Sequence, residues 1–124
     1  VVTKFDIRFT QPNKEFMSTG GIHTLEHLMA EYIRDEMEGV IDLSPMGCRT
    51  GFYFLLRDSI NYNDIIKLVQ ETCLFISNYD DVIPGNKKEE CGNYLDHDLD
   101  KAKKYAQDYY EIIKDYKKEQ LNYE

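Results

Sequence analysis

Apolar and polar residues alternate near the start of the chain. Within residues 2–9, Phe5, Ile7 and Phe9 point to one side of an extended chain, and the charged residues between them point to the other. This period of two predicts a half-buried strand. Two more short strands are predicted at residues 40–43 and 52–56, which flank a loop rich in turn-forming residues.

A helical period replaces the alternation in three other segments. Apolar residues recur at helical spacing from Ile22 to Met37, after a Gly-Gly pair, and again through residues 62–79. Asp98 is a favourable N-cap for a third helix. The apolar stripe of that helix comprises Leu99, Ala102, Ala106, Tyr109 and Ile113.

The order of these elements indicates the fold class. Residues 80–90 carry many charges and a Pro-Gly pair, so they are predicted to form a surface loop, and the charged tail beyond Tyr116 is expected to fray. Three helices with three or more strands predict an α+β fold in which an antiparallel sheet packs against helices as a two-layer sandwich. Residues 1–124 show no internal repeat, and we expect one domain.

The charge, hydrophobicity and cysteine content of the chain limit the kinds of partner and cellular setting that it suits. A net charge of −8 and a pI near 4.9 argue against nucleic acid or an anionic membrane surface. No apolar run reaches the roughly 18 residues that a membrane span needs. Cys48, Cys73 and Cys91 are odd in number and widely spaced, which is typical of reduced thiols in a cytoplasmic protein rather than of a disulfide framework.

The sequence His-Thr-Leu-Glu-His, residues 23–27, carries the clearest chemical signal. On a helix, His23 and His27 project from one face about one turn apart, with Glu26 beside them. Two imidazoles at this spacing can share a divalent metal ion, and a neighbouring carboxylate can move protons for the chemistry that the metal activates. The spacing therefore predicts a metal site.

A catalytic site of this kind usually has three protein ligands. Cys91, Cys48, His97 or a carboxylate can supply the third, and Cys91 is attractive because Gly92 follows it. A thiolate with two imidazoles favours zinc or Fe(II) over magnesium or calcium. His97 is equally consistent with a residue that supports the ligands and with an ordinary surface residue, whereas Cys73 lies in a helical stripe and is predicted to be core.

Two other groups of residues allow more than one interpretation. Cys48 follows the Pro-Met-Gly segment of a loop, where it is either a small buried residue or a proton-transfer thiol whose pKa the adjacent Arg49 lowers. Arg8 and Arg34 are either substrate-binding or simply solvated.

Several blocks of the sequence together resemble the LuxS family, the S-ribosylhomocysteine lyases. They occur in the family's order and span nearly the whole chain, so they are far more specific than the five-residue motif alone. The blocks are residues 5–9 with 12–14, residues 21–28 (Gly-Ile-His-Thr-Leu-Glu-His-Leu), residues 44–53 and residues 90–94.

The resemblance implies a role for each candidate residue. His23, His27 and Cys91 would hold one divalent metal per subunit, Fe(II) in native enzymes and often zinc in isolated protein, with cobalt as a possible substitute. Glu26 and Cys48 would be the two general acid/base groups. The positions that shape the substrate pocket would be Arg8, Arg34, Asp42 and Tyr53. The family also implies a homodimer with active sites at the subunit interface.

The implied reaction is the cleavage of S-ribosylhomocysteine into homocysteine and dihydroxypentanedione, the precursor of autoinducer-2. Metal-assisted proton transfers move the sugar's carbonyl along the chain until the thioether can be eliminated. Family members carry a further segment before the first strand seen here, so one alternative is a truncated or degenerate member that binds metal and dimerises without turnover. A second alternative is an inverse-zincin metallopeptidase, which also uses His-x-x-Glu-His.

Overall fold

The structure is a computed structural model, and it describes residues 2–57, 61–85, 87–89, 92–93 and 95–116. The predicted fraying of the tail beyond Tyr116 falls outside these residues. The described chain forms three strands and three helices. In chain order they are β1 (Val2–Arg8), α1 (Thr19–Glu36), β2 (Val40–Pro45), β3 (Gly51–Arg57), α2 (Tyr62–Ser77) and α3 (Leu99–Ile113).

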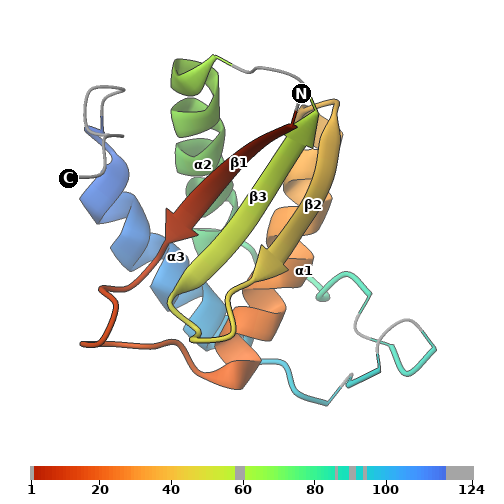
Figure 1. The fold of residues 1–124 in the computed structure, drawn as a ribbon. Coiled ribbons are helices and arrows are strands. Elements are labelled where there is room, and N and C mark those ends of the chain that lie inside the picture. The colour runs from red at the N-terminus through yellow and green to blue at the C-terminus, as the bar shows by residue number, and fades with distance from the viewer. Residues whose placement is uncertain (1, 58–60, 86, 90–91, 94, 117–124) are drawn as a thin grey trace.

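The strands form one antiparallel sheet in the order β1-β3-β2 (Figure 1). Tyr53 on the central strand pairs with Asp6 of β1 and Ser44 of β2, so these three side chains share one face. At the end of this ladder the backbone of β1 passes close to Gly51. A Cβ atom there would lie 2.0 Å from the carbonyl oxygen of Ile7, so only glycine fits.

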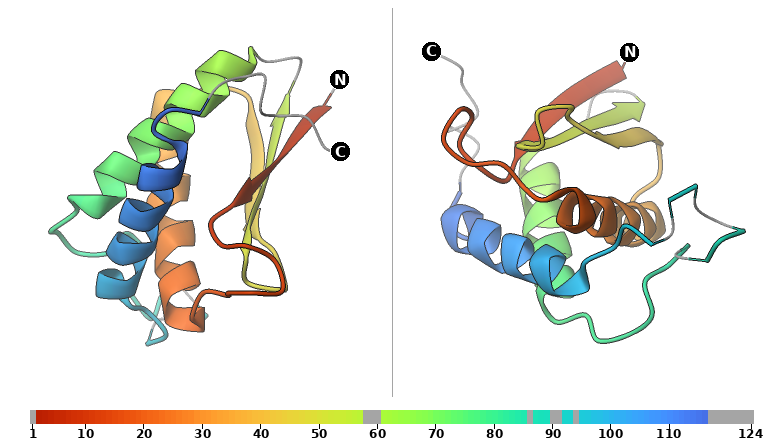
Figure 2. Two further views of the ribbon diagram at one scale, coloured as in Figure 1. Left: turned by 90° about the vertical axis from the view of Figure 1, so that its left-hand side faces the viewer. Right: turned by 90° about the horizontal axis from the view of Figure 1, so that it is seen from below.

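All three helices cover the same face of the sheet (Figure 2). Phe52, Phe54 and Leu56 of β3 are fully buried beneath them, as the alternation in the sequence requires. The other face carries the charged residues of β1, which are Lys4, Asp6 and Arg8. The predicted α+β fold, a sheet packed against helices in two layers, is confirmed.

The helix ends lie within two residues of the predictions except at the start of α1. This helix begins at Thr19, three residues before the predicted Ile22, because Ser18 caps it by accepting a hydrogen bond from the Gly21 amide at 3.1 Å. The Gly-Gly pair therefore lies inside the first turn. Asp98 caps α3 as predicted. Among the described residues, no helix is both long and apolar enough to cross a bilayer.

Candidate functional site

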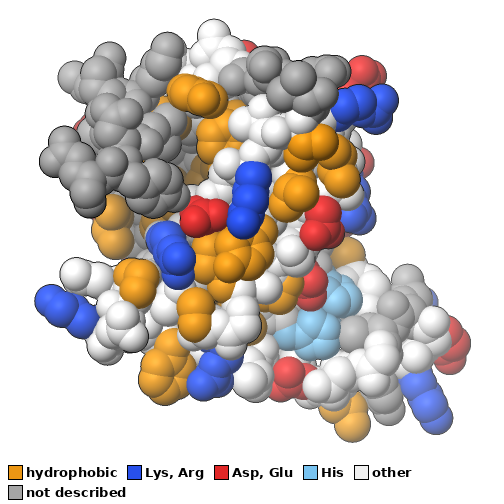
Figure 3. All heavy atoms as spheres, viewed as in Figure 1, with side chains coloured by type: hydrophobic (Ala, Val, Ile, Leu, Met, Phe, Trp, Pro, Cys, Tyr) orange, Lys and Arg blue, Asp and Glu red, His pale blue; other side chains and the backbone are white. Residues whose placement is uncertain are grey.

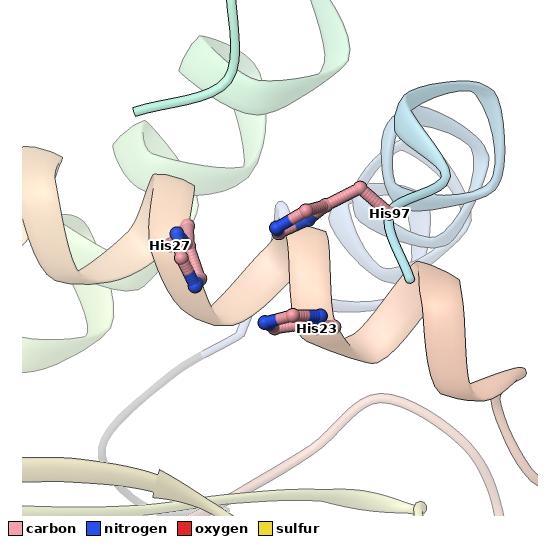
Figure 4. Close-up of side chains that lie close together, drawn as sticks. All are labelled: His23, His27 and His97. Atoms are coloured by element: carbon pink, nitrogen blue, oxygen red, sulfur yellow. The ribbon is translucent and has the colours of Figure 1, made fainter. Parts of the chain in front are cut away.

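Three imidazoles meet at the side of α1. His23 and His27 project from this helix one turn apart, and His97 reaches them from the segment just before α3 (Figure 4). One nitrogen from each ring lies within 4.8 Å of the others. The His97 ring stacks on the His23 ring at a centroid distance of 4.0 Å. The three rings thus form a compact nitrogen-rich cluster.

Backbone carbonyls set the tautomers of the two helix histidines. His23 Nδ1 lies 2.6 Å from the Asp96 carbonyl oxygen, and His27 Nδ1 lies 2.7 Å from the Pro84 carbonyl oxygen. A carbonyl only accepts, so each Nδ1 must carry the hydrogen, and each Nε2 then bears the lone pair that a metal needs. Metal-binding histidines in proteins are typically oriented in this way. The pair therefore fits a divalent metal.

A glycine allows the loop to approach His27 closely. Gly85 follows the carbonyl that His27 contacts and has a φ of +65°, a conformation that favours glycine. A Cβ atom at this position would lie 3.3 Å from His27 Nδ1, tighter than an ordinary contact. The charged segment predicted as a plain surface loop thus orients a histidine.

His97 is held through Thr24 rather than through a carbonyl. Thr24 is fully buried, and its Oγ1 lies 2.9 Å from His97 Nδ1 and 2.9 Å from the Asp98 amide nitrogen. Burial, and to a smaller extent the neighbouring His23 and His27 imidazoles, lower the pKa of His97 to about 4, although Asp96 opposes the shift. The ring is therefore neutral near pH 7.

The identity of a third ligand stays a prediction. Cys91, which the resemblance assigns to the metal, lies outside the described residues. His97, which the sequence left undecided, lies in the cluster.

Glu26 occupies the same turn of α1 as the two histidines and is half-buried. Histidine side chains reach the molecular surface at this point, with acidic side chains beside them (Figure 3). A carboxylate in this position is suited to proton transfer with a ligand that enters from solvent. Its assignment as a general acid/base stays a prediction.

A second cluster forms where β1 meets the loop between β2 and β3. Arg8 donates from Nη1 to Thr50 Oγ1 at 2.6 Å, and Thr50 Oγ1 lies 3.1 Å from Cys48 Sγ. Because arginine only donates, the Thr50 hydroxyl hydrogen can point to the sulfur. This side-chain hydrogen bond from Thr50 is the largest cause that lowers the pKa of the exposed Cys48 thiol; a Thr50 backbone hydrogen bond and Arg8 contribute further.

The prediction that Arg49 lowers the pKa of Cys48 was wrong. Arg49, its sequence neighbour, has a φ of +62° and places its guanidinium over the Phe16 ring, 4.6 Å from the centroid. Arg8, forty residues away in the sequence, lies near the sulfur instead, at 3.9 Å. The interpretation of Cys48 as a small buried residue is excluded by its exposure, whereas Cys73 is buried as predicted, which raises its pKa to about 12.

The predicted substrate-binding residues are divided between the two layers of the fold, the sheet and the helices. Arg8, Asp42 and Tyr53 lie on the strands of the sheet; Arg8 and Tyr53 share the outer face, the face away from the helices, where Lys4 Nζ sits 4.3 Å from the Tyr53 ring centroid. Arg34 is exposed in the last turn of α1. The structure thus brings Arg8 to Cys48 and leaves Arg34 on the helix layer.

Sequence reasoning missed two threonines. Thr24 lies four residues before the buried Leu28, so a polar residue on the apolar stripe of α1 was a signal that a buried hydrogen bond was needed. Thr50 lies two residues after Cys48, and its contact with Arg8 depends on the pairing of β1 with β3.

The fold and site define an α+β protein with a histidine centre suited to a divalent metal. Comparison with known proteins gives the family: the family model described as S-Ribosylhomocysteinase (LuxS) matches residues 1–120. The chain belongs to this family, as the sequence blocks predicted.

Three curated relatives share one name. The chain is 47% identical over 107 residues to the S-ribosylhomocysteine lyase of Thermus thermophilus, a match that covers 86% of this chain and 69% of the relative. It is 46% identical over 125 residues to that of Finegoldia magna, covering 99% and 80%. The corresponding protein of Clostridioides difficile is 50% identical over 107 residues, covering 86% and 70%.

Proposed function

We propose that this chain is an S-ribosylhomocysteine lyase, a carbon–sulfur lyase that takes part in autoinducer synthesis. The observation that carries the proposal is the pair His23 and His27, set by carbonyls to present two Nε2 lone pairs in a chain whose relatives bear this name. The metallopeptidase and non-catalytic alternatives gain no support from these relatives.

The metal would be held by His23 and His27 with Cys91 as the third ligand, one ion per subunit. A bound divalent ion, Fe(II), zinc or cobalt, supplies Lewis acidity toward the sugar's oxygen atoms. The half-buried Glu26 is placed on the same turn of α1, where its carboxylate can take a proton from a carbon next to the carbonyl and return it to another atom.

Two such transfers move the carbonyl along the sugar without net oxidation. When a proton is then removed from the carbon between the carbonyl and the C–S bond, the electron pair forms a C=C bond and the thiolate leaves. Protonation of the sulfur gives homocysteine. The enol that remains loses its hydroxyl proton and gains a proton on its terminal carbon, which gives dihydroxypentanedione. Glu26 and Cys48 exchange these protons, and the lowered pKa of Cys48 favours its thiolate as a base.

The substrate would contact Arg8, Asp42 and Tyr53 on the sheet and Arg34 on α1. Arg8 is suited to this role because it lies on the outer face of the sheet and its guanidinium contacts both Thr50 and Cys48. The helices leave this outer face uncovered (Figure 2). We therefore assign it to a homodimer interface in which each 1–124 chain is one domain and active sites lie between subunits.

A reducing, cytoplasmic setting suits this chemistry. Cys48 and Cys73 are both unpaired thiols among the described residues. A thiol that moves protons must stay reduced.

The test is release of free thiol from S-ribosylhomocysteine by protein purified without oxygen and loaded with Fe(II) or Co(II). We expect Glu26→Gln to lower release by about 100-fold or more with unchanged metal content, because it removes the proton acceptor. Glu31→Gln is the matched control, since Glu31 is an exposed carboxylate on the same helix.

Each outcome has a distinct meaning. Absence of thiol release by the metal-loaded parent chain would overturn the lyase assignment. Full activity of Glu26→Gln would remove Glu26 from the reaction, and loss of metal in that variant would make Glu26 a ligand instead.

A further inference from the structure

One ring nitrogen of the histidine cluster has no hydrogen-bond partner among the described residues. This atom is His97 Nε2, and it is buried. The His97 ring extends over the His23 ring toward His27, so its outer end enters the cluster (Figure 4). A buried polar atom without a partner usually indicates a group that is completed by a ligand.

The contacts of Thr24 decide which His97 nitrogen carries the hydrogen. The Asp98 amide donates to Thr24 Oγ1, so the hydroxyl accepts from that side. Its own hydrogen needs an acceptor, and among the described residues His97 Nδ1, at 2.9 Å, is the acceptor at hand. A neutral imidazole that accepts at Nδ1 carries its hydrogen on Nε2.

This tautomer is the opposite of that in the two helix histidines. Carbonyl contacts leave lone pairs on Nε2 of His23 and His27, whereas the Thr24 contact puts a hydrogen on Nε2 of His97. A nitrogen that carries a hydrogen cannot bind a metal. If His97 adopted the other tautomer, the buried Thr24 hydroxyl would lose its acceptor, which is unfavourable.

We propose that His97 is not a metal ligand but donates a hydrogen bond from Nε2 to a substrate oxygen in the centre. The inference rests on the proposed lyase function, since the oxygen belongs to a hydroxyl or carbonyl group of the sugar. Removal of a proton from the adjacent carbon makes such an oxygen negative, and a fixed N–H donor stabilises that charge. His97 is thus a further catalytic residue.

The first test reads the tautomers directly by ¹⁵N NMR of the zinc-loaded protein. The chain has three histidines, so single substitutions assign every imidazole signal. We expect hydrogen on Nε2 of His97 and on Nδ1 of His23 and His27. A zinc-bound Nε2 in His97 would overturn the proposal, whatever the activity of the protein.

The second test compares two variants that replace different nitrogens. His97→Asn keeps a polar atom near Nδ1 for Thr24 and loses the donor in the centre, whereas His97→Gln keeps an amide N–H near the position of Nε2. We expect His97→Asn to bind zinc within about threefold of the parent while its kcat/KM falls about 10- to 100-fold. His97→Gln should recover part of that loss.

Other outcomes contradict the proposal. A loss of zinc affinity of about 100-fold in both variants, with circular dichroism showing an intact fold, would make His97 a ligand. Equal kcat/KM in the two variants and the parent would remove the donor role. If the parent releases no thiol, the lyase assignment fails, and the NMR result still decides whether His97 binds metal.

Discussion

The histidine cluster on α1 and the Cys48 cluster at the end of the sheet are built in different ways. Backbone carbonyls of Asp96 and Pro84 orient His23 and His27, whereas the side chains of Thr50 and Arg8 set the environment of Cys48. The first cluster is partly buried, whereas the Cys48 thiol of the second cluster is exposed. Backbone contacts thus fix the orientation of His23 and His27, whereas side-chain contacts lower the pKa of Cys48.

This difference matches two demands of the proposed reaction. A metal requires nitrogens whose lone pairs converge before the ion arrives, and rigid carbonyl contacts meet that need. A proton-transfer thiol must be reached by a substrate and must ionise readily, which exposure and the Thr50 hydroxyl provide. Substitutions in one cluster should therefore leave the other unchanged.

The largest effect should come from His27→Ala. Removal of one imidazole from the pair is expected to weaken zinc affinity by more than about 100-fold, which exceeds the usual cost of losing a supporting contact. Chelator competition measures the affinity. The pH profile of Cys48 alkylation should stay unchanged in this variant, and a shift in that profile would show that the two clusters are coupled.

A smaller effect is expected for Gly85→Ala. The new Cβ atom would strain a backbone at φ +65° and press on His27 Nδ1 at 3.3 Å, which disturbs the Pro84 carbonyl contact. We expect zinc affinity to fall about tenfold. Gly47→Ala is the matched control, because no atom lies within 4 Å of a Cβ atom there, and it should bind zinc like the parent. Equal affinities would mean that the loop does not orient His27.

Local patterns predicted more of the fold than of the site. Periodicity located all six described elements, and it failed at the start of α1, where the Gly-Gly pair suggested a boundary but the Ser18 side chain caps an earlier turn. In the site, the helical spacing of His23 and His27 is a local property and was visible in the sequence.

The contacts that complete the site are not local. His23 meets Asp96 across 73 positions, and Arg8 meets Thr50 across 42. Such contacts depend on how elements pack and on strand register, which a period cannot specify. The adjacent Arg49 was therefore an unreliable guide to the environment of Cys48.

A still smaller and more selective effect should come from Thr50→Val. This change keeps the shape of the buried side chain and removes the hydroxyl that is the largest cause of the lowered Cys48 pKa. A lowered pKa means that the thiolate forms at lower pH, so loss of the hydroxyl should move Cys48 alkylation by iodoacetamide to higher pH. Zinc affinity should stay at the parent value.

Substitutions of Arg8 and Arg49 refine this prediction. Arg8→Gln should shift the alkylation profile in the same direction as Thr50→Val but less, since the Arg8 contribution is smaller. Arg49→Gln should not shift it, because that guanidinium lies over Phe16. If Arg49→Gln shifted the profile and Arg8→Gln did not, the sequence neighbour rather than the cross-sheet arginine would control the thiol, and the hydrogen-bond chain from Arg8 through Thr50 to Cys48 would not operate in solution.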